Sequence, residues 1–150
     1  MNETLSADDF SELPRSEFAF PGSLRDRLVS AIGDGRKVAT TSLALEYEIG
    51  HEALPCTGQR SVVVDSDNQP VCVIETVEVL IVPLGAVDFG HVVDEGEGHT
   101  TVRDWRTGHE NFWRSKEMAA SLGDAAPIFG DSTPVVFERF RVVERLSSAD

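Results

Sequence analysis

The segment RSVVVDSDNQPVCVIETVEVLIV, residues 60–82, decides the fold class of this chain. Two runs rich in β-branched residues flank the turn-forming residues DSDNQP, and this arrangement is typical of a β-hairpin. We therefore expect strands near 60–65 and 70–82, with a bend or bulge in the second strand because of its length. The segment TPVVFERFRVVERL, residues 133–146, alternates in character and predicts another strand.

Helical patterns lie on both sides of the hairpin. One helix is expected from Ser23 to Gly33, where glycine can end it, and a second over residues 100–121. Residues 42–55 fit either a strand followed by a loop or a short helix, and residues 83–99 are expected to form a loop with at most a helical turn. This order of elements predicts an α+β domain in which a sheet curls around one core, with helices against it.

The composition indicates an acidic protein of one domain. The chain has 150 residues, is 41% hydrophobic and carries a formal net charge of -13. Such a charge repels nucleic-acid phosphates at long range and argues against non-specific duplex binding. Because the N-terminus lacks the apolar region of a signal peptide and no apolar run approaches ~20 residues, we expect a cytoplasmic protein without a membrane partner. Cys56 and Cys72 have no metal-ligand spacing and are expected to be reduced thiols.

Two segments depart from the acidic character of the rest. Residues 21–41 and 99–118 contain more Lys and Arg than Asp and Glu. The first overlaps GDGRKVATTSL, residues 33–43, in which a glycine-rich turn is followed by two cations and three hydroxyls. Such a turn can build a small positive pocket, which suits one or a few nucleotides better than a long duplex.

The same turn has the spacing Gly35-x-Lys37-x-x-Thr40, which resembles the GxKxxT signature of the ASCH (ASC-1 homology) domain family. The segments EYE, LP..G, PVCVIETVEV, DEGEG, WR..H..FW and ERFRVV follow in the order of the bacterial YhfF-like subgroup. His99, directly after GEG, departs from the acidic residue that the subgroup often has there, which affects the charge of the cleft rim.

The resemblance implies a fold and a set of functions. The fold is a PUA-like curled β-barrel of about five or six mixed strands with two main flanking helices, over residues 18–146. Residues 1–17 are then an acidic N-terminal segment, expected to be a loose tail or a short helix. ASCH domains are regarded as RNA-binding modules. Some are described as ribonucleases helped by a divalent metal, and small members as amidohydrolases acting on N4-acylated cytidine.

The expected partner is therefore a short single-stranded RNA, a nucleotide or a nucleoside. A non-catalytic protein-interaction module is the remaining alternative, and the fold by itself does not choose among these functions. The sequence predicts no oligomeric state.

Three residues are candidates for a catalytic group. Lys37 could act as a base or contact a phosphate, and Thr40 could act as a nucleophile. Glu75 lies in an apolar strand, where a carboxylate is costly unless it is paired, and Lys37 is its expected partner. The resemblance implies the same grouping, since the amidohydrolase-like members join a glutamate to the lysine and threonine. The structural alternatives are a solvated lysine, a threonine bonded to its own backbone and a water-facing glutamate.

Other residues are candidates for nucleotide binding. An aromatic side chain could stack on a base, and an arginine could hold a phosphate with two hydrogen bonds. The alternatives are core positions for the tryptophan and the histidine, and an acidic partner for the helical arginine. The candidates are Arg36, Lys37, Thr41, Trp105, Arg106 and His109.

An acidic loop precedes the second predicted helix. Asp94, Glu95 and Glu97 could supply oxygen ligands to Mg²⁺ or Mn²⁺, but they are weak candidates, and a solvated acidic loop is the favoured interpretation. A tight zinc site is not expected, because no Cys/His set has zinc spacing.

Overall fold

The computed structural model describes residues 12–123 and 129–146. Its strands form one mixed sheet in the order β1-β3-β4-β5-β2, with β1 parallel to β3 and the other neighbours antiparallel. The sheet is open, because β1 and β2 lie at its two edges. The strands are β1 (Arg15–Ser16), β2 (Ala39–Leu43), β3 (Arg60–Val64), β4 (Pro70–Pro83) and β5 (Pro134–Arg145). The α+β class is thus confirmed.

The predicted hairpin lies at the centre of the sheet. β3 and β4 pair antiparallel, and β4 runs on beyond the end of β3 while remaining paired with β5. Its register shifts between Val73 and Ile74 and again between Thr76 and Glu78. Such irregularities bend a strand and increase its twist, so the long β4 curls as its length predicts.

The helices differ from the prediction in two places. The helix from Ser23 is confirmed as α1, and the ambiguous region 42–55 contains α2. The expected loop 83–99 instead holds η2 and α3, and the expected helix 100–121 is two helices, because the Ser115 side chain accepts a hydrogen bond from Met118 N–H and starts a new one. The elements are α1 (Ser23–Gly33), α2 (Ala44–Ile49), η2 (Leu84–Ala86), α3 (Phe89–Glu95), α4 (Val102–Trp113) and α5 (Lys116–Leu122).

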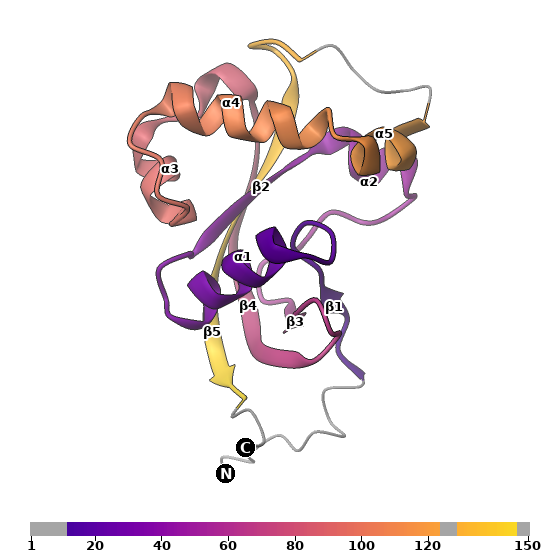
Figure 1. Ribbon diagram of the computed structural model, residues 1–150, viewed down its shortest axis with the longest axis vertical. Coiled ribbons are helices and arrows are strands. Elements are labelled where there is room, and N and C mark those ends of the chain that lie inside the picture. The colour runs from indigo at the N-terminus through magenta and orange to yellow at the C-terminus, as the bar shows by residue number, and fades with distance from the viewer. Residues whose placement is uncertain (1–11, 124–128, 147–150) are drawn as a thin grey trace.

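The helices divide the core into parts. α4 and α5 lie across one end of the long β4–β5 ribbon, and α1 lies farther along it (Figure 1). Trp105 and Trp113 belong to the cluster formed with α3, α4 and α5, whereas Ile32 and Phe140 belong to the cluster beneath α1. The helices α3, α4 and α5 therefore pack on one hydrophobic cluster, and α1 packs on another.

The N-terminal prediction is only partly covered by the structure. Residues 1–11 of the expected segment 1–17 lie outside the described residues. Arg15 and Ser16 pair with Val62 and Val63 as strand β1, so the end of that segment belongs to the sheet.

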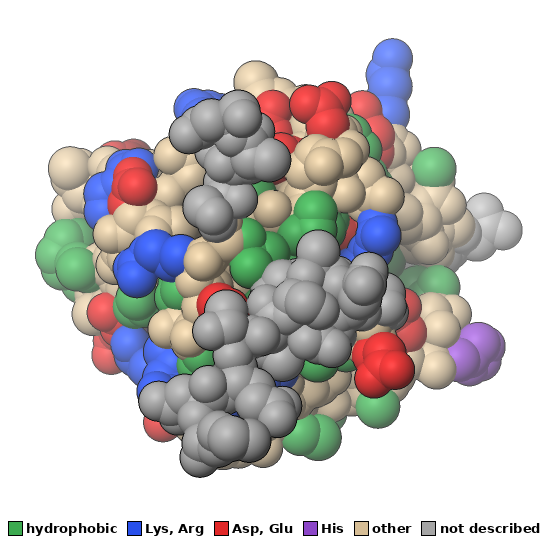
Figure 2. Space-filling view, turned by 90° about the horizontal axis from the view of Figure 1, so that it is seen from below, with side chains coloured by type: hydrophobic (Ala, Val, Ile, Leu, Met, Phe, Trp, Pro, Cys, Tyr) green, Lys and Arg blue, Asp and Glu red, His purple; other side chains and the backbone are tan. Residues whose placement is uncertain are grey.

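The surface at the end opposite α4 has mixed character. Figure 2 shows acidic and basic side chains interspersed with hydrophobic ones over the part of this face that is not grey. Cys56 is exposed, Cys72 is buried, and neither forms a disulfide within the described residues. No helix in the described part of the chain is long and apolar enough to cross a membrane.

A close backbone contact joins the turn before β2 to the end of α3. Gly96 ends α3 in the left-handed conformation, with φ 63°. A Cβ atom at this position would lie 2.1 Å from the Arg36 carbonyl oxygen and 2.9 Å from the Lys37 backbone nitrogen. The Val38 N–H donates to the Asp94 carbonyl at 2.8 Å beside this contact. Glycine at 96 thus lets the chain around Lys37 lie directly against the end of α3.

Replacing this glycine should destabilise the fold. We expect Gly96→Ala to lower the free energy of unfolding by about 2–4 kcal/mol, because the new methyl group meets backbone atoms as well as an unfavourable φ. Gly98→Ala is the matched control: its φ is +87°, but no neighbouring atom of residues 12–123 or 129–146 lies within 4 Å of the added Cβ, so the loss of unfolding free energy should be about 1 kcal/mol. Urea unfolding measures both, and equal losses would contradict the close contact.

Candidate functional site

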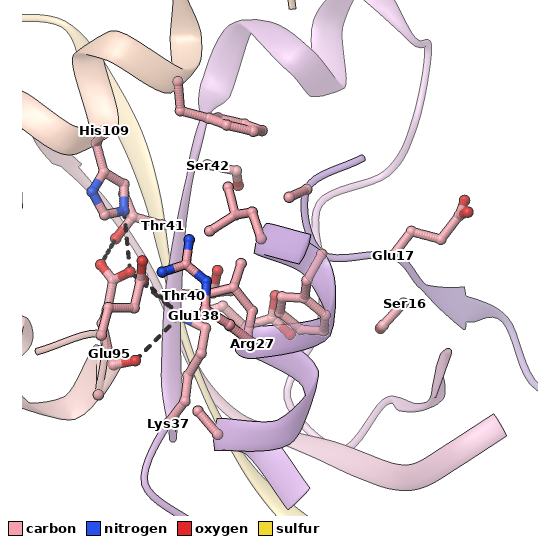
Figure 3. A pocket seen from close by; sticks show the side chains of 18 of the residues that line it. Ser16, Glu17, Arg27, Lys37, Thr40, Thr41, Ser42, Glu95, His109 and Glu138 are labelled. Atoms are coloured by element: carbon pink, nitrogen blue, oxygen red, sulfur yellow. Dashed lines mark hydrogen bonds and ion pairs between the residues drawn. The ribbon is translucent and has the colours of Figure 1, made fainter. Parts of the chain in front are cut away.

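A cleft of about 1030 Å³ opens between α1, strand β2 and the C-terminal half of α4. Apolar walls come from α1 and from aromatic rings on several elements, and polar groups lie along β2 and β5 (Figure 3). Most residues singled out from the GxKxxT turn line this cleft. The lining residues that matter below are Arg27, Lys37, Thr40, Thr41, Ser42, Tyr47, Glu95, Glu97, His109, Phe112 and Glu138.

Lys37 lies at the inner end of the cleft with only 1% of its side chain exposed. Its ammonium donates to the Ala39 carbonyl at 2.9 Å and to Glu97 Oε2 at 3.1 Å. Glu95 Oε1 is 3.5 Å away. The three N–H groups therefore have acceptors inside the protein, and the buried charge is compensated by two carboxylates.

The Glu95 carboxylate is the centre of this arrangement. Its Oε2 accepts hydrogen bonds from Trp105 Nε1 at 2.7 Å and from the Thr41 hydroxyl at 2.8 Å, and His91 Nε2 is 2.7 Å away. Burial opposes ionisation, but hydrogen bonds from His109 and His91 and the charge of Lys37 hold the pKa of Glu95 well below its ordinary value. We conclude that Glu95 is ionised and saturated with donors. We refer to Lys37, Thr41, His91, Glu95, Trp105 and His109 as the Glu95 network.

His109 completes the network on the cleft side. Its Nδ1 lies 2.9 Å from the Trp105 carbonyl oxygen, and its Nε2 lies 3.2 Å from Glu95 Oε1. Both ring nitrogens thus face acceptors, which favours the imidazolium form. Burial alone would lower the pKa of His109, yet the hydrogen bond and charge of Glu95 raise it above its ordinary value. The ring also stacks on Trp105, with centroids 4.2 Å apart.

The expected pairing of Lys37 with Glu75 is wrong. Glu75 accepts hydrogen bonds from Arg60 at 3.1 Å and from Arg141 at 2.9 Å, at the surface of the sheet and outside the cleft lining. These arginines lie on neighbouring strands directly opposite Glu75, and they lower its pKa. The prediction that a strand carboxylate needs a cation was sound, but cross-strand neighbours supply it.

The two threonines of the turn have different surroundings. They alternate along β2, so Thr41 is buried in the Glu95 network, whereas Thr40 is half-buried, lines the cleft and lies opposite Glu138 of β5. Arg36 is exposed at the cleft edge and pairs with Asp34 at 3.0 Å. Thr40 is thus placed to meet a ligand, and Thr41 to hold the network.

Two candidates of the second charged segment do not face the cleft. Trp105 is fully buried and donates to Glu95, so it offers no stacking surface to a base. Arg106 pairs with Glu110 at 2.8 Å and with Asp131, and lies outside the cleft lining. Of this segment's three candidates, His109 alone reaches the cleft.

The acidic candidates for a metal site separate in the structure. Asp94 pairs with Arg139 at 2.6 Å, while Glu95, Glu97 and His109 offer ligand atoms within 4.8 Å of one another. These three residues do not fit a divalent ion, because the Lys37 ammonium already lies between the carboxylates and the oxygens of Glu95 accept from several donors.

The cleft is not the positive pocket that the sequence predicts. Among the described residues, its lining contains six glutamates but only four Lys and Arg side chains, and Lys37 is neutralised by Glu95 and Glu97. Sequence reasoning missed two residues that matter here, Arg27 and Glu138. The alternating pattern of the β5 segment could have drawn attention to Glu138, which shares a face with apolar residues. The sequence of α1 contains no comparable signal for Arg27.

Comparison with known proteins identifies the family. A family model described as ASCH domain matches residues 16–144. The chain belongs to the ASCH domain family. An ASCH domain from Lactobacillus crispatus JV V101 is 26% identical, with a TM-score of 0.77 over 94% of this chain and 87% of that one. Protein EF3133 from Enterococcus faecalis V583, of family model DUF984, is 29% identical, with a TM-score of 0.76 over 88% and 77%. Curated proteins give no match.

These similarities confirm the family and the fold expected from the sequence. This ASCH domain has the PUA-like architecture, here an open, curled sheet with flanking helices. In it, the signature lysine is the one buried in the Glu95 network.

Removing the charge of Glu95 should destabilise the domain. We expect Glu95→Gln to lower the free energy of unfolding by about 3–5 kcal/mol, because Lys37 and His109 lose their buried counter-charge. Since the pKa of Glu95 is depressed in the folded state, its contribution exists above about pH 4.5 and is lost as the pH falls below that value.

Urea unfolding at pH 7 and pH 3.5 measures this difference. Glu75→Gln is the matched control, because it removes a surface carboxylate that also pairs with two cations. It should lower the free energy of unfolding clearly less than Glu95→Gln does. Equal losses for the two variants would contradict the central place of Glu95.

His109 should titrate above its ordinary value. We expect NMR to give a pKa above 6.5 for His109 in the native protein and a lower one in the Glu95→Gln variant, because the acceptor then has no charge. Stabilisation from this raised pKa is complete below the unfolded value and is lost as the pH rises through the folded value. A His109 pKa at or below 6.5 would show that burial outweighs Glu95.

Proposed function

We propose that this ASCH domain binds a single nucleotide, or the terminal nucleotide of a short single-stranded RNA, in the cleft. The observation that carries the proposal is the position of Arg27, which extends from α1 into the cleft (Figure 3). Among the described residues it forms no hydrogen bond or ion pair. In a chain of net charge -13, a cation without a partner in a cleft favours an anionic ligand group, and a guanidinium suits a phosphate.

The walls support a flat ring as the other part of the ligand. Phe18, Tyr47 and Phe112 come from separate parts of the chain and line the same cleft. Stacking of a base on an aromatic ring contributes about 1–3 kcal/mol and tolerates any base. These rings can take the stacking role that the sequence assigned to Trp105.

The charge of the lining supports a ligand with few phosphates. Six glutamates around the cleft repel a polyanion, whereas one phosphate near Arg27 meets a local cation. A mononucleotide or a strand end satisfies both conditions better than the middle of a long RNA.

The hydrolytic alternatives have less support from the geometry. A lysine base needs a free electron pair, but Lys37 donates to Ala39, Glu95 and Glu97. Amide hydrolysis of N4-acylated cytidine and RNA cleavage remain predictions. Release of acetate from N4-acetylcytidine, or shortening of an end-labelled RNA, would show them.

Loss of the Arg27 charge should weaken binding. We expect Arg27→Gln to reduce the affinity for nucleoside 5′-monophosphates about 10- to 100-fold, as expected for a hydrogen bond to a charged group, and to reduce the salt dependence of binding. Arg103→Gln is the matched control, because Arg103 is exposed on α4 and lies outside the cleft lining. Isothermal titration calorimetry measures both, and unchanged affinity in Arg27→Gln would contradict the proposal.

A further inference from the structure

One carboxylate of the cleft stands apart from the others. Glu95 has several donors, Glu97 pairs with Lys37, and Glu46 accepts from the Leu43 N–H as part of the start of α2. Glu17 pairs with Arg25, and Glu52 is exposed, whereas Glu138 is half-buried. Glu138 lines the cleft with no ion-pair partner among the described residues. It receives one hydrogen bond, from the Thr76 hydroxyl to Oε2 at 2.7 Å.

The orientation of Glu138 is fixed by the sheet. It lies on β5 between Thr40 of β2 and Val79 of β4, and the bond from Thr76 anchors one of its oxygens. A carboxylate oxygen can accept two hydrogen bonds, so both oxygens retain capacity for a ligand. Burial raises the pKa of Glu138 and the Thr76 bond offsets this in part, which reflects a carboxylate that lacks a cation.

Hydroxyl groups lie on the same side of the cleft. Ser42 and Tyr47 hydroxyls are 3.1 Å apart, and Thr40 precedes Ser42 by two residues and therefore faces the same way along β2. Tyr47 and Glu138 line the same cleft, and burial, with a smaller contribution from the charge of Glu138, raises the pKa of Tyr47. Glu138 is thus a hydrogen-bond acceptor in a small polar area of the cleft.

We infer that Glu138 recognises the Watson–Crick edge of guanine, so that the cleft selects guanine nucleotides. This rests on the proposed nucleotide binding. Guanine is the base that presents two adjacent donors, N1–H and the 2-amino group, and these match the two oxygens of one carboxylate. Adenine and cytosine place an acceptor nitrogen beside their amino group, and uracil has carbonyls on both sides of its N3–H, so each would bring a lone pair against the carboxylate.

Titration calorimetry with GMP, IMP, AMP, CMP and UMP tests the inference. We expect GMP to bind the native protein about 10-fold or more tighter than AMP, CMP and UMP. IMP retains N1–H but lacks the 2-amino group, so its affinity should fall between these values. This comparison uses the native protein and does not depend on any variant folding.

Glu138→Gln adds a second readout. The amide can still accept from Thr76, but it replaces one acceptor by a donor, so the preference for GMP over AMP and CMP should disappear. Glu144→Gln, on the same strand and outside the cleft lining, should keep the preference. Equal binding of all bases, or a preference that survives in Glu138→Gln, would overturn guanine selection while leaving nucleotide binding intact. Binding of no nucleotide would overturn both.

Discussion

The Glu95 carboxylate is buried in the middle of the domain and accepts hydrogen bonds from side chains that come from four parts of the fold. Lys37 reaches it from the turn before β2, Thr41 from β2, His91 from α3, and Trp105 and His109 from α4. An ionised carboxylate in this position is unfavourable by several kcal/mol unless its donors are in place. The network therefore fixes how these elements meet, and with them the inner end of the cleft.

The charges around the cleft follow from that constraint. The cations that the sequence offers as ligand contacts, Lys37 and His109, are held by Glu95 and Glu97, so they contribute order rather than free positive charge. Arg27 and Glu138 remain, the first without a partner among the described residues and the second with one neutral donor. The cleft thus offers a ligand this unpaired cation from α1 and this carboxylate acceptor from β5.

The sequence predicts the fold better than it predicts the site. Periodicity and turn residues reveal the hairpin and α1, and the ordered motifs identify the family, because these signals are local. The partners of Lys37 and Glu75 depend on which strands become neighbours: β5 brings Arg141 to Glu75, and the end of α3 brings Glu95 to Lys37. Gly96, in the DEGEG segment, permits that second contact, and the local pattern around it gives no sign of the turn it packs against. The sequence around Trp105 likewise fits either a core residue or a residue that stacks on a base. The hydrogen bond from Trp105 to Glu95 shows that it is a core residue.

A double-mutant cycle between Lys37 and Glu95 tests the network most directly. The free energies of unfolding of the native protein, Lys37→Met, Glu95→Gln and the double variant are measured in urea at pH 7. If the two charges stabilise each other in the core, the double variant is less destabilised than the sum of the single variants, by about 1–3 kcal/mol. Additive losses, within about 0.5 kcal/mol, would contradict the account, because the buried ammonium and carboxylate would then not depend on each other.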